Sequence, residues 1–158
     1  MSDVIHDSFV IARAYPARPA AVFRAFADPA RKRRWYVDGG HATPEAYELD
    51  FREGGRERAE TRLGDDTPFP GVAMIAESVH LDIRPDQRIV MAQTMTIGER
   101  RISAALITFE IRPADAGSEL VMTHQAAFFE GADGPAMRRG GWEALLDGLG
   151  MALSPDAA

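Results

Sequence analysis

Histidine is the residue type in this sequence best suited to transferring a proton. The chain contains four of them, His6, His41, His80 and His124. His124 alternates with Leu120 and Met122 in a strand pattern, so it lines the interior if that face points inward. Because the pKa of imidazole lies near neutrality, such a histidine could act as a general base or orient a ligand oxygen. The alternative is a structural histidine held by a hydrogen bond.

Glu77 is the carboxylate that the strand patterns favour for an interior position. It alternates with Ile75 and Val79 on an otherwise apolar face, and a glutamate inside a cavity would have a raised pKa and could shuttle a proton. The opposite face, with Met74 and Ser78, competes for the inward side, and strand glutamates usually lie on the solvated face. We therefore treat His124 and Glu77 as candidates for catalysis and assign no catalytic residue.

Metal chemistry and covalent chemistry are not expected. His80 and Asp82 share a strand face at i, i+2 spacing, but zinc and iron sites use three or four ligands. The sequence has no cysteine, which removes disulfides, Cys-ligated zinc and a thiol nucleophile. No serine lies in a nucleophile-elbow pattern. We expect no metal and no cofactor.

Length, composition and charge limit the partners. The chain has 158 residues, 46% of them hydrophobic, with 18 Lys and Arg against 24 Asp and Glu and a net charge of −6. These values are typical of one globular domain, here 1–158 with a core at about 8–153. The basic run from Arg31 to Arg34 is expected to be a solvated helix face, so no nucleic acid is expected. Apolar runs are too short for membrane insertion, and we expect a cytoplasmic location.

Periodicity and turn residues predict the elements that must position these side chains. Strands are expected at 9–15, 46–51, 56–63, 72–83, 88–96, 101–111 and 119–126, and helices at 19–27, 29–35 and 134–153. Asp28 followed by Pro29 marks the start of the second helix. Short connections favour antiparallel pairing. We expect an α+β helix-grip fold: a curved antiparallel sheet of about six to seven strands wrapped around a long C-terminal helix, with two short helices after the first strand.

Six ordered segments carry a family resemblance. They are Pro19–Phe26, Asp28-Pro29, Trp35, Leu49–Gly55, Ile83–Val90 and Gly141–Leu149. Together they resemble the START-like, birch-pollen-allergen-like (SRPBCC) superfamily, and within it the bacterial branch related to the C-terminal domain of the activator of heat-shock-protein ATPase. The resemblance spans residues 8–153 and implies a helix-grip fold whose cavity holds apolar or amphipathic ligands in some members.

The function expected from these observations is that of a START-like domain that binds a small apolar or amphipathic ligand in an internal cavity. The expected lining residues are Trp35, Phe51, Met74, Met91, Gln93, Met122, His124, Phe128, Trp142, Leu145 and Leu149. Two alternatives stay open: a cyclase- or hydrolase-like enzyme that uses His124 or Glu77, and a co-chaperone-like protein-interaction module. A homodimer and a chaperone contact are compatible with each.

Overall fold

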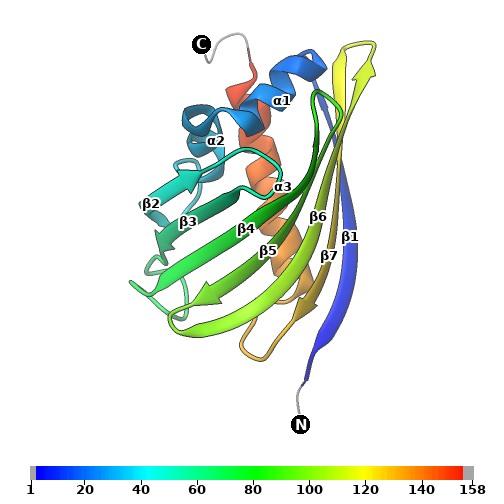
Figure 1. Cartoon of the computed structure of the whole chain (residues 1–158). Coiled ribbons are helices and arrows are strands. Elements are labelled where there is room, and N and C mark those ends of the chain that lie inside the picture. Colours follow the sequence, from blue (N-terminus) through cyan, green and yellow to red (C-terminus); the bar gives the residue numbers. More distant parts are fainter. Residues whose placement is uncertain (1–2, 155–158) are drawn as a thin grey trace.

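A single curved sheet dominates the computed structural model, which describes residues 3–154 (Figure 1). Its seven antiparallel strands are ordered β1-β7-β6-β5-β4-β3-β2. The strands are β1 (Ile5–Tyr15), β2 (Thr43–Leu49), β3 (Arg56–Arg62), β4 (Ala73–Arg84), β5 (Arg88–Ile97), β6 (Arg100–Ala114) and β7 (Gly117–Phe128). The helices are α1 (Pro19–Ala27), α2 (Pro29–Tyr36) and α3 (Pro135–Ala152). The α+β helix-grip fold predicted from the sequence is confirmed.

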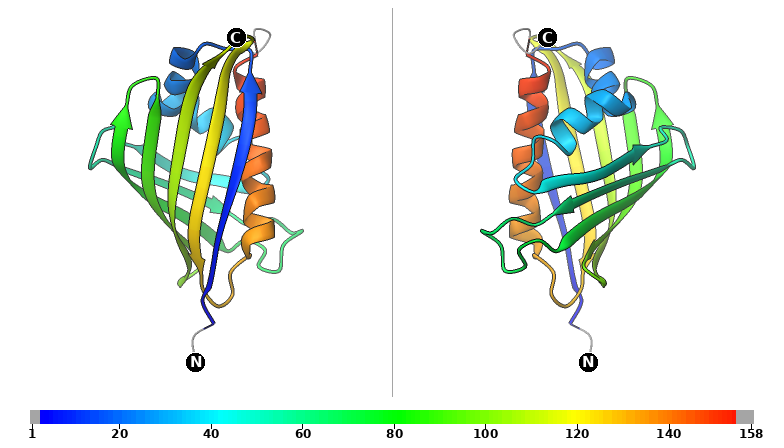
Figure 2. Two further views of the ribbon diagram at one scale, coloured as in Figure 1. Left: turned by 90° about the vertical axis from the view of Figure 1, so that its right-hand side faces the viewer. Right: turned by 90° about the vertical axis from the view of Figure 1, so that its left-hand side faces the viewer.

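The three helices all lie on the inner side of the sheet. Helix α3 runs beside β1 and next to α2 in both views of Figure 2. Its buried face presents Trp142, Leu146 and Leu149 to the sheet. The hydroxyl of Tyr15 at the end of β1 donates to the Leu146 carbonyl at 2.7 Å, which ties the strand to the helix. The result is a sheet whose concave face is covered by one long helix and a helix pair.

The start of α2 follows the predicted capping chemistry. The Asp28 side chain accepts hydrogen bonds from the backbone N–H groups of Ala30 at 2.9 Å and Arg31 at 3.2 Å. These bonds satisfy amide groups that have no partner within the helix. The cap breaks the chain direction between α1 and α2, and so places the inward side of α2 over the β2–β3 end of the sheet (Figure 1).

Several strands differ in their bounds from the sequence-based expectation, and β1 and β4 show the differences that matter for the interior. β1 begins at Ile5 instead of residue 9, because pairing with β7 continues to Phe128. In β4 the register shifts between His80 and Asp82, so the prediction that these two residues share a face is wrong. His80 is buried, whereas Asp82 forms an ion pair with Arg88 at 2.6 Å. A bulge of one residue reverses the faces of the residues that follow it.

Among the described residues, no helix is long and apolar enough to cross a membrane.

Candidate functional site

Strand pairing arranges the inner face of the sheet in rows that cross the central strands, and three of these rows lie next to the buried row of Ile89, Phe109 and Met122. The deep row consists of His80, Met91, Ile107, His124 and Phe9. The middle row consists of Glu57, Ser78, Gln93, Ala105 and Ala126. The rim row consists of Ala59, Ala76, Met95, Ser103 and Phe128. These rows give the positions from which an internal site can be built.

The deep row is closed. All five of its side chains are buried, and in the row beyond it Phe109 packs against Trp142 of α3 with ring centroids 5.8 Å apart. Close-packed interiors of this kind leave no room for a ligand beyond the deep row. Any internal site therefore lies over the middle and rim rows, and the deep row can contribute to it only along its border with the middle row.

The middle row has small side chains where it crosses β6 and β7. Ala105 and Ala126 are cross-strand partners on the inner face. Both are partly exposed, although His124, Ser103 and Phe128 around them are buried. Solvent therefore reaches the inner face of the sheet above this alanine pair.

Under α2, the middle row carries a buried ion pair. Lys32 and Glu57 are each 2% exposed, and Nζ of Lys32 lies 3.0 Å from Oε2 and 3.3 Å from Oε1 of Glu57. The Tyr47 hydroxyl donates to Oε2 of Glu57 at 2.5 Å. The ammonium group also lies 4.5 Å from the centre of the Tyr36 ring, an arrangement that stabilises a cation away from water.

A second set of hydrogen bonds continues this arrangement toward β5. Nε2 of Gln93 donates to the Ser78 hydroxyl at 3.1 Å and to the Tyr36 hydroxyl at 3.1 Å. Burial and the neighbouring Glu57 carboxylate raise the pKa of Tyr36 and of Tyr47, so both phenols stay protonated. We call Lys32, Tyr36, Tyr47, Glu57, Ser78 and Gln93 the paired network.

On the β6–β7 side, three buried side chains have polar atoms without a partner among the described residues. They are Ser103 through its hydroxyl, His124 through both ring nitrogens, and Arg138 through one terminal nitrogen. The other guanidinium nitrogens of Arg138 bind Asp133 at 2.8 and 2.7 Å. We call Ser103, His124 and Arg138 the unpaired cluster.

Both buried histidines are held neutral. Burial lowers the pKa of His124 to about 4, and the positive charge of Arg138 adds to this effect. Burial also lowers the pKa of His80, whose Nδ1 lies 3.3 Å from the Gly55 carbonyl oxygen. A neutral imidazole has one N–H donor and one acceptor nitrogen. His124 can therefore both donate and accept, yet does neither with any described residue.

The residues expected to line a cavity divide into three groups. Met91, Gln93, His124 and Phe128 lie in the three rows, and Trp142 faces them from α3. Met74, Phe51 and Leu145 are partly exposed at the edges of the interior. Trp35, Met122 and Leu149 are fully packed core residues, with Nε1 of Trp35 donating to the Ala25 carbonyl at 3.0 Å.

Glu77 does not face the interior, contrary to the expectation from its apolar neighbours. It is exposed on the outer face of β4, because Ser78 and His80 occupy the inner face. The inward carboxylate is Glu57, which sequence reasoning missed. Its signal is in β3: Arg56, Arg58 and Arg62 share one face, which leaves Glu57 on the other.

The basic run of α2 also differs from the expectation of a solvated face. Arg31, Arg33 and Arg34 are exposed, but Lys32 is buried with Glu57. The burial of one side chain in a run of four cations cannot be predicted from charge alone. Lys32 can be buried because a carboxylate and aromatic rings surround its ammonium group.

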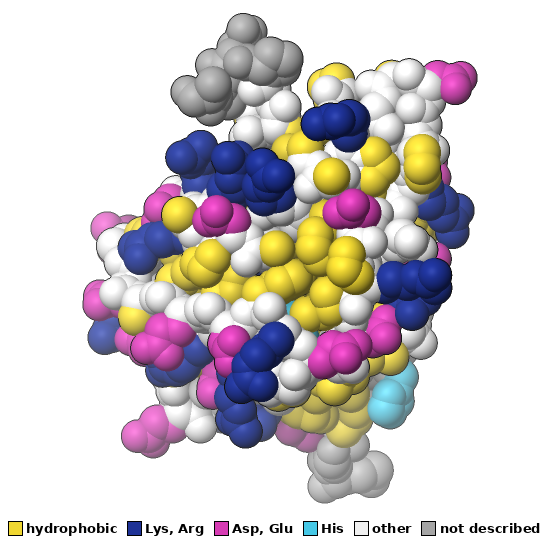
Figure 3. Space-filling model, turned by 45° about the horizontal axis from the view of Figure 1, so that its top comes forward, with side chains coloured by type: hydrophobic (Ala, Val, Ile, Leu, Met, Phe, Trp, Pro, Cys, Tyr) yellow, Lys and Arg dark blue, Asp and Glu magenta, His cyan; other side chains and the backbone are white. Residues whose placement is uncertain are grey.

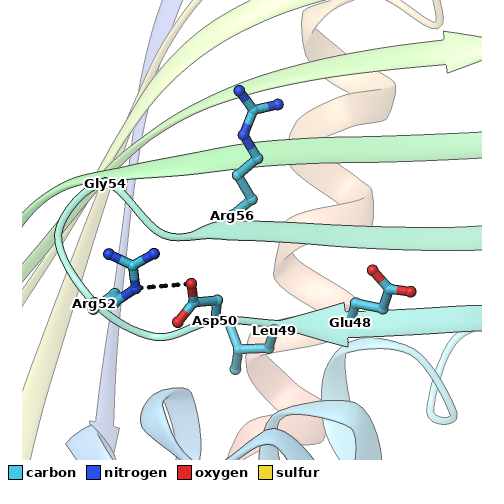
Figure 4. A pocket seen from close by; sticks show the side chains of 6 residues that line it. All are labelled: Glu48, Leu49, Asp50, Arg52, Gly54 and Arg56. Atoms are coloured by element: carbon cyan, nitrogen blue, oxygen red, sulfur yellow. Dashed lines mark hydrogen bonds and ion pairs between the residues drawn. The ribbon is translucent and has the colours of Figure 1, made fainter.

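The hollow shown in Figure 4 lies on the outside, at the turn between β2 and β3. Its charged side chains are exposed, and Arg52 is already paired with Asp50 at 2.8 Å. Among the described residues, no three His, Asp or Glu side chains come together as a metal site. The inner face of the sheet therefore remains the candidate site.

A band of hydrophobic side chains crosses the outside of the molecule in the view of Figure 3, with charged side chains on both sides of it. Leu81 and Leu106 on the outer face of the sheet are 52% and 39% exposed. Val79, Ala92 and Leu106 are cross-strand neighbours there. This band offers apolar contact but no buried polar group.

Comparison with known proteins gives a family and a set of related structures. Residues 16–154 match the family described as Activator of Hsp90 ATPase homolog 1-like protein. An uncharacterized protein from Rhizobium leguminosarum is 35% identical, with a TM-score of 0.89 and 97% of each chain covered. A protein from Rhizobium loti is 41% identical, with a TM-score of 0.85 and coverage of 96% of this chain and 99% of that one.

More distant structures share the fold alone. DynU16, from the dynemicin biosynthetic locus, is 16% identical with a TM-score of 0.64, and the match covers 95% of this chain and 48% of that one. None of the curated proteins matches the chain in sequence.

Proposed function

The chain belongs to the family of Activator of Hsp90 ATPase homolog 1-like proteins, and from that premise we propose that it binds a small apolar or amphipathic ligand between the inner face of the sheet and helix α3. The observation that carries the proposal is the partial exposure of Ala105 and Ala126, which face inward among buried neighbours. Small side chains in the middle of a concave face leave space that larger ones would fill.

The side chain of Met95, near the alanine pair, suits an apolar ligand. Met95 lies in the rim row beside Ser103 and is partly exposed, and its flexible thioether can adapt to different ligand shapes.

The test uses alanines that differ only in the face they occupy. Ala126 faces inward, while its neighbour Ala127 faces outward and pairs with Ala104. We would titrate the wild type, Ala126→Leu and Ala127→Leu with N-phenyl-1-naphthylamine, an uncharged probe whose fluorescence rises in apolar sites. We expect saturable 1:1 binding to the wild type and to Ala127→Leu, and about tenfold weaker binding to Ala126→Leu because the leucine fills the site. Equal binding by the two variants would refute an internal site.

An enzymatic role for His124 is less well supported. A general base of this kind works with an orienting partner within hydrogen-bond reach, and neither nitrogen of His124 has one among the described residues. The inward carboxylate, Glu57, is already bound to Lys32 and Tyr47. These contacts favour binding over proton transfer.

Self-association through the outer apolar band is the second candidate, supported by the exposure of Leu81, Leu106 and Val10. Exposed apolar patches often mark contacts between proteins. Sedimentation equilibrium of the wild type and of Leu106→Glu distinguishes the two roles. A dimer that dissociates in Leu106→Glu supports this candidate, and a monomer in both excludes it.

A further inference from the structure

The unpaired cluster surrounds one aromatic ring. Ser103 is the cross-strand partner of Phe128, and the rings of His124 and Phe128 are stacked with centroids 6.3 Å apart. The guanidinium carbon of Arg138 lies 5.0 Å from the centre of the same ring. Three elements, β6, β7 and the first turns of α3, therefore place the three polar side chains around the alanine pair, with Ser103 at its rim end and His124, four residues before Phe128 in β7, at its deep end.

The free atoms of this cluster need hydrogen-bond partners. Ser103, His124 and Arg138 are 1%, 0% and 6% exposed, and four of their polar atoms have no partner among the described residues. A buried polar atom left without a partner destabilises the folded chain, because it has lost its hydrogen bonds to water and gained none in return. On the other side of the same sheet, the paired network satisfies buried polar atoms within the chain, although the Thr61 hydroxyl of β3 also has no partner among the described residues.

Charge balance decides what kind of group fits. The two bonds between Arg138 and Asp133 form a bidentate ion pair with no net charge. His124 is neutral above a pH of about 4. A carboxylate or phosphate placed here would lack a compensating charge in a buried environment, which is strongly unfavourable. An uncharged oxygen can accept from the guanidinium, from the imidazole N–H or from the hydroxyl without that cost.

We propose that the free donors of Ser103, His124 and Arg138 bind uncharged oxygens of the ligand, carbonyls or hydroxyls, at the two ends of the site, while the apolar body of the ligand lies over Ala105 and Ala126. This inference rests on the proposed function, since it assigns the chemical class of the ligand of that same site. It makes the occupant a ketone, an enol or an alcohol with an apolar skeleton, and it excludes fatty acids and other organic anions.

The test compares three naphthalene derivatives of similar size as competitors of N-phenyl-1-naphthylamine: 2-acetylnaphthalene, 2-isopropylnaphthalene and 2-naphthoate. The measured quantity is the ratio of the dissociation constants of the ketone and the hydrocarbon, in the wild type and in His124→Phe. Phenylalanine keeps a ring for stacking on Phe9, which lies 4.5 Å from the His124 ring. The ratio removes differences in general hydrophobicity between the two ligands.

We expect the ratio to shift about tenfold in favour of the hydrocarbon in His124→Phe, as for one lost hydrogen bond inside a protein. 2-Acetylnaphthalene has one oxygen, so the ratio shifts in Ser103→Ala instead if that oxygen binds at the rim end. 2-Naphthoate binds more weakly than the ketone. An unchanged ratio in both variants overturns the inference, because water then satisfies the cluster.

The remaining outcomes separate this inference from the proposed function. Tightest binding of 2-naphthoate identifies an anion site and overturns the inference while the internal site stands. Displacement of the probe by none of the three also overturns the inference alone, provided that the probe itself binds as expected. If the probe does not bind the wild type, both proposals fail.

Discussion

The two halves of the inner face differ in whether their clusters of buried polar side chains are hydrogen-bonded. On the side of β3, β4 and β5, the polar side chains of the paired network bind one another, including the ion pair of Lys32 and Glu57. On the side of β6 and β7, Ser103, His124 and one nitrogen of Arg138 have no partner among the described residues. Lys32, Glu57, Ser78 and Gln93 of the paired network are buried, and so are Ser103, His124 and Arg138.

This contrast distinguishes polar side chains that stabilise the fold from polar side chains that are free to bind a ligand. A complete network holds α2 on the sheet and gains nothing from another molecule, because its donors and acceptors are occupied. An incomplete cluster is stabilised by any group that supplies the missing partners. Burial alone would have placed both sets in the same category, so the hydrogen-bond inventory is what distinguishes them.

The largest predicted effect comes from breaking the paired network. Lys32→Met should lower the free energy of unfolding by about 3–5 kcal/mol, because it leaves the Glu57 carboxylate buried without its cation. Urea denaturation measures this value. The double variant Lys32→Met, Glu57→Leu should recover much of the loss, since it removes both charges. A single variant as stable as the wild type would contradict a structural role for the ion pair.

Lowering the pH should destabilise the folded chain through His124 of the unpaired cluster. Because burial holds the pKa of His124 at about 4, the folded chain binds a proton less readily than the unfolded chain, whose imidazole has a pKa near 6.5. The free energy of unfolding therefore falls as the pH decreases from about 6.5 to 4, by about 3 kcal/mol from this residue. Burial of His80 acts in the same direction.

The variant His124→Phe isolates that contribution. Its stability should depend less on pH than that of the wild type over this range, while carboxylate titration affects both proteins alike. Urea unfolding at pH 7, 5.5 and 4 gives the comparison. Parallel curves for the two proteins would show that His124 is not a buried neutral imidazole.

The smallest effect comes from two serines in corresponding environments. Ser78→Ala removes the acceptor of a Gln93 hydrogen bond and should cost about 1 kcal/mol. Ser103→Ala removes a hydroxyl that has no described partner and should be neutral or slightly stabilising in the ligand-free protein. Thermal unfolding of both variants tests the pair. A larger loss of stability in Ser103→Ala than in Ser78→Ala would contradict the assignment of Ser78 to the paired network and of Ser103 to the unpaired cluster.

The sequence predicts most of the fold because each element has its own local signal. Asp28 caps α2 as expected, and the alternation of Leu120, Met122 and His124 correctly puts His124 inside. The interior polar groups were harder to predict. Lys32 and Glu57 are 25 residues apart and meet only because α2 crosses β3, and the absence of partners for His124 depends on side-chain geometry that periodicity does not contain.

The most direct test of an internal ligand site is to observe the alanine methyl groups of both sheet faces at once. We would record carbon-proton NMR spectra of the chain labelled at alanine methyls during titration with 2-acetylnaphthalene. If the ligand lies over the middle row, the Ala105 and Ala126 signals shift and saturate at one equivalent, and those of Ala104 and Ala127 stay in place. Shifts confined to Ala104 and Ala127, or no shifts at all, would contradict an internal site.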